Sequence, residues 1–360
     1  MVNLKQKINA GLYSYCAKPV FFLCDPELMH TFFIRIGEIL GKYSIFKYLT
    51  RFFFSYQNKM LEQNIAGLKF RNPVGLSAGF DKNAQMISIM EDVGFGFTEV
   101  GSVTAQACEG NPGKRLARIV EEKSIWVNFG LNNEGADQIY KKLKGRRYGI
   151  PFGISVARTN CRETADEDVA VQDYIYSAKI FREVGDFLVL NISCPNAYGG
   201  QPFSEGKRFE KLVKEVSKLG ISKPIFVKLS PDLNKREIDK IISLSKKYKV
   251  RGLICTNLTK DKAKKSGGYS GKIVEQRSDQ LLEYVYKKTK GEFILIGVGG
   301  IFSAEDAYRK IKLGANLVEL ITGMIYEGPG LIGEINHGLC TFLKRDGYKN
   351  ISQAVGKGVA

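Results

Sequence analysis

The residues best suited to chemistry lie in one short segment, residues 191–196, with the sequence Asn-Ile-Ser-Cys-Pro-Asn. It directly follows the apolar run 187–190, a pattern typical of a buried strand that delivers polar groups at its C-terminal end. Cys194 is a candidate nucleophile, a candidate general base or an inert core thiol. A thiol, with a pKa near about 8.5, ionises more readily than a hydroxyl, and we expect nearby lysines to lower the pKa further. His30 and His337 are far away in sequence, so proton transfer involving carbon is favoured over acyl chemistry.

The elements that must position this segment alternate between strand and helix from residue 61 onward. This pattern predicts a parallel sheet with helices outside it, and eight units favour a closed (β/α)8 TIM barrel over an open sheet. The expected strands are 74–78, 97–100, 152–156, 187–190, 225–229, 252–255, 293–296 and 317–320. The expected helices are 84–93, 134–143, 167–184, 210–219, 235–247, 274–288, 304–313 and 332–343. Barrel enzymes keep their chemistry at the C-terminal ends of the strands, so residues just beyond each strand should share one rim.

Two glycine-rich turns follow the last two expected strands, at residues 297–300 and 322–323. Glycine lets backbone N–H groups approach an anion, and barrels commonly bind phosphate at this place, although such turns also serve as ordinary connections. Lys228 lies inside an apolar strand, where it must meet a negative charge or lose its proton. An anionic cofactor ring, a phosphate or a local carboxylate could be its counter-ion.

Four amides, Asn128, Asn191, Asn196 and Asn257, are expected on loops at the same rim. Each alone is more often a turn former, but together they suit a planar ligand that both donates and accepts hydrogen bonds. The sequence therefore predicts one site at the barrel mouth that combines amides, a lysine, a thiol and phosphate-binding turns.

The first 60 residues differ from the rest, with 13 Phe and Tyr, eight Lys and Arg and only three acids. Asp25 followed by proline predicts the start of a helix, and a second apolar cluster with interleaved cations covers residues 46–54. Such helices are typical of an interfacial membrane anchor, of a lid, or of a hairpin packed on the core. We expect an N-terminal extension (1–60), a barrel (61–345) and a C-terminal tail (346–360). Residues 257–278 are expected to be a loop insertion that could be mobile.

The composition limits the classes of function that this chain can have. The formal net charge of +17 suggests anionic partners or a generally basic surface. Seven scattered cysteines without a CxxC pair indicate neither a disulfide framework nor a zinc site, and only two histidines exclude a multi-histidine metal centre. The cysteine pattern fits a reducing cytoplasm; no apolar run is long enough for a transmembrane helix, and the N-terminus lacks a secretory signal pattern.

Several of these motifs resemble those of the dihydroorotate dehydrogenases, flavin enzymes of pyrimidine synthesis. The resemblance runs from about residue 25 to about residue 335. It is carried by the segments 72–76, 78–83, 99–104, 110–112, 191–196, 228–233 and 296–301. It implies an FMN-containing barrel that oxidises dihydroorotate to orotate, in which Cys194 removes the C5 proton while hydride leaves C6 for the flavin.

The same resemblance implies the roles of the other rim residues. Substrate-binding positions match Lys82, Asn128, Asn191, Asn196 and Asn257. Cofactor-binding positions match Ala78, Gly79, Ser102, Ser155, Asn191, Lys228, Thr256, Gly271, Gly299, Gly300, Thr322 and Gly323. Thr322, Gly300 and Gly323 match positions near the phosphate of FMN.

The N-terminal extension and the segment 115–118 are similar to the membrane-associated class that passes electrons to a quinone. In that class the counterparts of His30 and Arg118 line the quinone tunnel. Cys194 departs from this class, which usually has serine there, and Ser155 departs from its asparagine. We therefore expect a peripheral enzyme on the cytoplasmic face of the membrane, a monomer or homodimer with no nucleic-acid partner. The alternatives are the same reaction with fumarate or NAD, motivated by Cys194, and an FMN-dependent tRNA dihydrouridine synthase, motivated by the positive charge.

Overall fold

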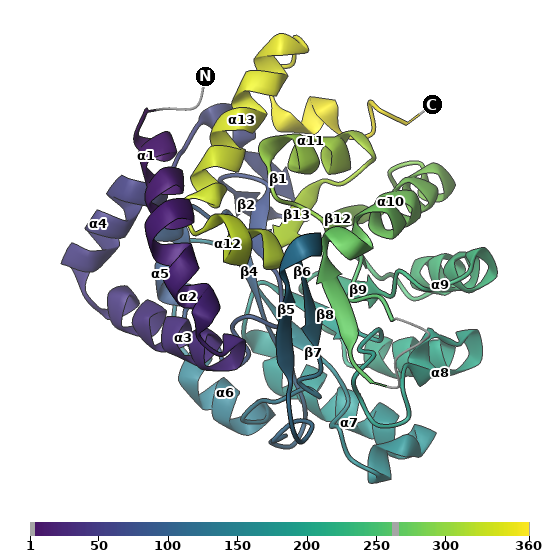
Figure 1. The fold of residues 1–360 in the computed structure, drawn as a ribbon. Coiled ribbons are helices and arrows are strands. Elements are labelled where there is room, and N and C mark those ends of the chain that lie inside the picture. Colours follow the sequence, from purple (N-terminus) through teal and green to yellow (C-terminus); the bar gives the residue numbers. More distant parts are fainter. Residues whose placement is uncertain (1–3, 261–265, 360) are drawn as a thin grey trace.

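The structure, a computed structural model, describes residues 4–260 and 266–359. Eight parallel strands close into a barrel that is surrounded by helices, as the sequence predicts (Figure 1). In the order in which they pair around the barrel, the strands are β3 (Val74–Leu76), β4 (Phe97–Val103), β7 (Phe152–Val156), β8 (Phe187–Asn191), β9 (Ile225–Leu229), β10 (Gly252–Cys255), β12 (Ile294–Val298) and β13 (Leu317–Leu320), and β13 pairs with β3. Four expected strands match these bounds. The structure ends β3 two residues earlier, extends β4 by three residues and β8 by one, and begins β12 one residue later and ends it two later.

The helices around the barrel follow the predicted alternation. They are α5 (Ile87–Val93), α6 (Ala136–Leu143), α7 (Glu167–Ile180), α8 (Gly206–Ser217), α9 (Lys235–Lys247), α10 (Glu275–Thr289), α11 (Ala304–Lys312), α12 (Thr322–Glu327) and α13 (Leu331–Arg345). α9 has the predicted bounds because Asn234 and Glu237 form a capping box that fixes its start. The expected helix over 167–184 ends earlier, and its last turn is the separate 3-10 helix Phe181–Glu183.

The lower part of the barrel is filled by aromatic rings that glycines make room for. Phe97, Phe187 and Phe226 point inward, and a Cβ on Gly153 would lie 2.0 Å from the Phe187 ring. A hairpin of β1 (Gln63–Ile65) and β2 (Leu68–Phe70) closes this end. The Phe70 ring packs edge-on against Phe97 at 5.5 Å between centroids. Large and small inward residues thus alternate, as in other barrels, and leave the opposite mouth for the site.

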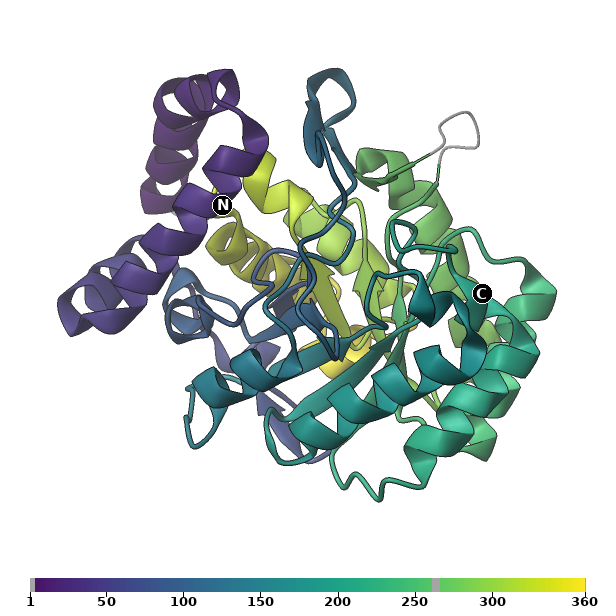
Figure 2. The same cartoon turned by 90° about the horizontal axis from the view of Figure 1, so that it is seen from below.

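A three-stranded antiparallel sheet stands beside the mouth, and the sequence did not predict it. Its strands are β5 (Leu116–Ile119), β6 (Ser124–Val127) and β11 (Gly268–Gly271), and the hairpin of β5 and β6 rises next to the N-terminal helices (Figure 2). β11 lies in the segment 257–278 that was expected to be a loop. Residues 261–265 of that segment lie outside the described residues, so its mobility stays a prediction.

The N-terminal extension is helical, with α1 (Leu4–Leu12), the π-helix Tyr13–Ala17, α2 (Lys18–Leu23), α3 (Pro26–Lys42) and α4 (Ser44–Phe54). The predicted start at Asp25 is confirmed, since its Oδ1 accepts hydrogen bonds from the N–H groups of Glu27 and Leu28. Helices before residue 25 were not predicted. Arg51 of α4 forms a 2.6 Å ion pair with Asp92 of α5, so this cation of the second cluster fastens the extension to the barrel. The C-terminal tail carries a 3-10 helix, Ile351–Ala354, whose two terminal side chains are fully buried.

Candidate active site

Three cavities meet at the barrel mouth. The first, the glycine cavity of about 60 Å³, is lined by the turns after β12 and β13 together with β11. The second, the amide cavity of about 140 Å³, is lined by Cys194 and four asparagines, and the third, the apolar cavity of about 310 Å³, lies under the N-terminal helices. Ala78, Lys228 and Asn257 line both the glycine and the amide cavity, and His30 lines both the amide and the apolar cavity. The three cavities therefore adjoin one another, with the amide cavity in the middle.

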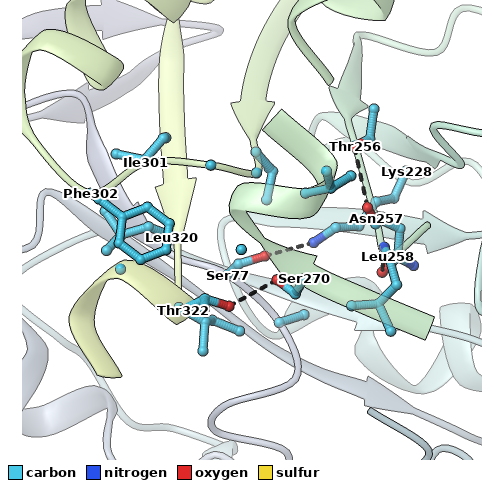
Figure 3. A pocket seen from close by; sticks show the side chains of 18 residues that line it. Ser77, Lys228, Thr256, Asn257, Leu258, Ser270, Ile301, Phe302, Leu320 and Thr322 are labelled. Carbon is cyan, nitrogen blue, oxygen red and sulfur yellow. Dashed lines mark hydrogen bonds between the residues drawn. The ribbon is translucent and has the colours of Figure 1, made fainter. Parts of the chain in front are cut away.

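The glycine cavity is built by backbone that side chains would obstruct. Gly299 and Gly300 have φ values of 110° and 74°, in the region that favours glycine. A Cβ on Gly323 would lie 2.0 Å from the carbonyl oxygen of Ile301, so this turn needs glycine for packing as well. Two hydroxyl groups border the cavity, those of Ser270 and Thr322, and their oxygens lie 2.9 Å apart (Figure 3). Exposed backbone and hydroxyls at helix starts are the groups that bind phosphate.

The amide cavity holds a linked set of side-chain amides. Asn257 Nδ2 donates to Asn191 Oδ1 over 3.2 Å, and Asn191 Nδ2 donates to Ser102 Oγ over 2.7 Å. Asn196 Nδ2 donates to the carbonyl of Val127, but its buried Oδ1 has no hydrogen-bond partner in the described part of the chain. A buried acceptor without a partner is costly, so Asn196 is prepared for a ligand N–H group.

Cys194 lies at the wall of the amide cavity and is partly buried. Burial raises the pKa of its thiol, while the backbone N–H groups of Asn196 and Ala197 and the charge of Arg158 act in the opposite direction. Lys260 lowers this pKa, as expected of a nearby lysine, but burial outweighs it, so the expected net lowering of the pKa is wrong. A thiol held in this way is inert in its neutral form and becomes a strong base once it ionises.

Lys82 extends into the same cavity, and its Nζ lies 3.6 Å from the centroid of the Phe129 ring. Burial lowers its pKa to about 7. The charge of Glu27 raises the pKa and the charge of Arg115 lowers it further. An ammonium group in a closed cavity, partnered by a ring face, favours an anionic ligand.

His30 separates the amide cavity from the apolar one. Its Nε2 is 2.8 Å from the carbonyl oxygen of Phe80, so the ring donates this proton. Burial, assisted by the charge of Lys82, lowers its pKa to about 3, and the ring is therefore neutral. Arg118 lines the apolar cavity, donates to the carbonyl of Cys24 over 2.8 Å and lies over the Phe22 ring.

Lys228 has counter-ions that the sequence analysis did not identify. Its Nζ is 3.0 Å from Glu99 Oε2 and 3.5 Å from Glu319 Oε2, and it donates to Ser77 Oγ over 2.9 Å (Figure 3). Of the counter-ions considered, the structure thus shows the local carboxylate, and it shows two of them. Every second residue of a strand faces the same side. Counting by two from Phe97 along β4 and from Leu317 along β13 could therefore have identified both acids as inward-facing.

The structure brings most of the predicted site residues together. Eight predicted cofactor residues line the glycine cavity: Ala78, Lys228, Thr256, Gly271, Gly299, Gly300, Thr322 and Gly323. Gly79, Ser102 and Asn191 line the amide cavity, as do Lys82, Asn196, Asn257 and Cys194. Ser155 lies behind Ser102, with the two hydroxyl oxygens 2.9 Å apart. Asn128 sits between the lining residues Val127 and Phe129, and its Oδ1 accepts from Asn111 over 2.9 Å.

A glycine-rich cavity beside a cationic, amide-lined one at the barrel mouth is typical of a (β/α)8-barrel enzyme, and the two cavities suit a phosphate group and a small anionic ligand. Comparison with known proteins narrows the class. A family model for dihydroorotate dehydrogenase matches residues 60–343, and the chain belongs to the dihydroorotate dehydrogenase family. The resemblance noted in the motifs is confirmed.

Individual relatives support the assignment over nearly the whole chain. The protein of Sulfurimonas denitrificans named dihydroorotate dehydrogenase (quinone) is 40% identical over 348 residues, which cover 94% of this chain and 97% of that protein. A protein of the same name from Gloeobacter violaceus is 36% identical with the same coverage. A ligand-free structure of the Eimeria tenella enzyme has a TM-score of 0.82 and 28% identity, covering 92% of this chain and 99% of that chain.

Proposed function

We propose that this protein oxidises (S)-dihydroorotate to orotate in pyrimidine synthesis and passes the electrons to a membrane quinone through FMN. The observation that carries the proposal is the set of three adjoining cavities, because each has the chemistry that one participant needs. The glycine cavity and the apolar cavity lie at the two ends, and the cationic amide cavity lies between them.

Dihydroorotate is a small carboxylic acid whose ring carries N–H and C=O groups. Lys82 offers the positive charge for its carboxylate, and the open Oδ1 of Asn196 offers an acceptor for a ring N–H. Asn128, Asn191 and Asn257 are proposed to complete the substrate site. Cys194 is proposed to take the proton from C5, with its thiolate stabilised by the N–H groups of Asn196 and Ala197.

The residues present fit FMN. Thr322, Gly323, Gly299 and Gly300 would hold the phosphate, and Ala78, Gly79, Ser102, Lys228 and Thr256 would surround the ring, with Gly271, Asn191 and Ser155 beside them. A positive φ of 109° at Gly79, with only Ile321 within 4 Å of a Cβ placed there, leaves space for a ring at this point. Bound FMN would accept the hydride from C6. Lys228 would place its ammonium group where reduction adds negative charge.

The apolar cavity is proposed to admit the quinone. His30 and Arg118 supply its polar groups, and the remaining lining is almost entirely aliphatic and aromatic. Its roof is formed by α2 and α3, whose outer faces expose Leu23 and Leu28 by 89% and 70%. We propose that this face docks on the cytoplasmic side of the membrane. In the described part of the chain no helix is long and apolar enough to cross a bilayer, so the proposed contact is peripheral.

Cys194 motivates the rival acceptors fumarate and NAD, and a comparison of acceptors tests the proposal. Purified protein is supplied with dihydroorotate and one acceptor at a time: a short-chain quinone, fumarate or NAD. We expect rapid orotate formation with the quinone and little with the others. Turnover with fumarate or NAD that equals or exceeds turnover with the quinone would overturn the quinone assignment while leaving dihydroorotate oxidation in place.

A further inference from the structure

A layer of charged side chains crosses the barrel interior directly beneath the glycine and amide cavities. Successive side chains of a strand face opposite sides, so Glu99, Lys228 and Glu319 point inward like Phe97, Phe226 and Leu317, two positions earlier on the same strands. All three are almost completely shielded from solvent, with relative exposures of 0%, 3% and 0%.

The two acids are not equivalent partners of the lysine. Lys228 donates to Glu99 Oε2 and to Ser77 Oγ at 3.0 and 2.9 Å, whereas Glu319 Oε2 is 3.5 Å away, too far for a good hydrogen bond. Among the described residues, Glu99 Oε1 and both carboxyl oxygens of Glu319 have no hydrogen bond of good geometry, although Glu99 and Ser77 lie near enough to Glu319 to act on its pKa. Two ionised carboxylates only accept hydrogen bonds, so they cannot satisfy each other.

The charges of the layer do not balance if every group is ionised. The inward-facing residues that the other five strands place around the three are without charge: Ser77, which follows β3, Ser155, Val189, Ile254 and Val298, the β12 residue that pairs with Glu319. Two carboxylates and one ammonium group would leave one buried negative charge without compensation, which is strongly unfavourable in a low-dielectric interior. One additional proton removes that charge and creates the missing hydrogen-bond donor between the acids.

We propose that Glu319 carries this proton at neutral pH, so that Glu99, Lys228 and Glu319 form a neutral triad, and that the triad sets the charge that Lys228 presents to the cofactor. Glu319 is then a positioning residue, which acts on the reaction through Lys228. The second part of the inference rests on the proposed binding of FMN.

The electrostatics of the triad agree with this assignment. Burial raises the pKa of Glu319 well above its ordinary value, the charge of Glu99 raises it further, and Lys228 acts in the opposite direction. Burial alone would lower the pKa of Lys228, but Glu99 and Glu319 reverse this effect and raise it. The proton therefore stays with the carboxyl pair while the lysine keeps its own.

Glutamine variants separate the neutral triad from a charged one. Glu319→Gln keeps the shape and the neutral charge, so the reduction potential of the bound flavin should stay at the wild-type value. In Glu99→Gln, Glu319 should release its proton and become the counter-ion of Lys228, again with little change. Only the double variant Glu99→Gln/Glu319→Gln leaves Lys228 uncompensated. It should favour reduced flavin at least tenfold, equivalent to about 30 mV for a two-electron couple.

Infrared spectroscopy of the flavin-loaded proteins observes the proton directly. The C=O band of protonated carboxyl groups in the wild type should lose one component in Glu319→Gln. The same component should be lost in Glu99→Gln, because Glu319 then releases its proton. Identical bands in wild type and Glu319→Gln would overturn the proposal. So would a potential shift in Glu319→Gln as large as that of the double variant. If no flavin co-purifies with the wild type, the proposed function itself has failed, a result distinct from both of these.

Discussion

Lys82 Nζ lies 3.6 Å from the centroid of the Phe129 ring, inside the cavity that also holds Cys194. The two residues come from segments more than forty positions apart, one following β3 and the other following β6. The ring face holds the ammonium group without neutralising it, and burial brings its pKa down to about 7. A substrate carboxylate can therefore pair with Lys82 without first breaking an ion pair of the chain.

Removal of this charge should weaken substrate binding specifically. For Lys82→Met we expect KM for dihydroorotate to rise roughly 10- to 100-fold, because a hydrogen bond to a charged group contributes about 1.5–3 kcal/mol. Lys144→Met is a matched control, since Lys144 also lies over a ring, Tyr140, but on the outside of the barrel. Steady-state kinetics check the result, and equal KM values in the two variants would remove Lys82 from the substrate site.

The pH dependence of KM follows from the same pKa. Below about pH 7 the free enzyme carries a charged Lys82, and above it the ammonium group is progressively lost, so KM should rise with pH across neutrality. The rise should be absent in Lys82→Met. A KM that falls with increasing pH would contradict the assigned sign.

Cys194 should control kcat through its ionisation. Because burial raises the thiol pKa, the thiolate fraction and kcat should both rise with pH in the alkaline range. Cys194→Ala should lose about 10²- to 10⁴-fold in kcat, the usual contribution of a general base. Cys194→Ser should retain some activity with a more alkaline profile. Similar rates for all three proteins at neutral pH would show that the thiol takes no part.

Obstruction of the apolar cavity should separate the two half-reactions. In Ile36→Trp a larger side chain enters the wall of the apolar cavity, which neither Lys82 nor Cys194 lines. Flavin reduction by dihydroorotate should proceed at the wild-type rate, while reoxidation by quinone should slow at least tenfold. Stopped-flow measurement of each step distinguishes them. Equal reoxidation rates would place the quinone elsewhere.

The exposed faces of α2 and α3 should carry membrane binding. The double variant Leu23→Ser/Leu28→Ser removes two of the most exposed apolar side chains and should bind liposomes several-fold more weakly. Val169→Ser is the control, since Val169 is also an exposed apolar residue but lies on α7, away from the N-terminal helices (Figure 1). Co-sedimentation with liposomes measures both, and an equal loss in the two variants would argue against a specific docking face.

The barrel was predictable from sequence because its signals are local. Apolar runs of four to five residues separate amphipathic helices, and the capping box at Asn234 or the N-cap at Asp25 marks a helix start directly. The sheet of β5, β6 and β11 was not predictable in this way. β11 pairs with β6 across about 140 residues of chain, and its glycine-rich sequence has no strand signal of its own.

The site residues also divide into those that the sequence predicts and those that only the structure shows. Residues at strand ends, such as Lys82, Asn191 and Cys194, were found because a barrel brings all strand ends to one rim. The partners of Lys228 were missed because Glu99 and Glu319 are inside strands, where their meeting depends on the register of three strands rather than on any motif. The pKa of Cys194 was predicted with the wrong sign, because burial depends on packing that the local sequence does not reveal.

Anaerobic mixing shows whether dihydroorotate gives its hydride to a flavin bound in this barrel. Purified protein with its bound flavin is mixed with dihydroorotate in the absence of any acceptor, and the visible flavin absorbance is followed. We expect bleaching within one turnover, orotate formed in equal amount to the flavin, and recovery of colour on addition of quinone. Flavin that keeps its colour in the presence of saturating dihydroorotate would show that dihydroorotate is not the hydride donor.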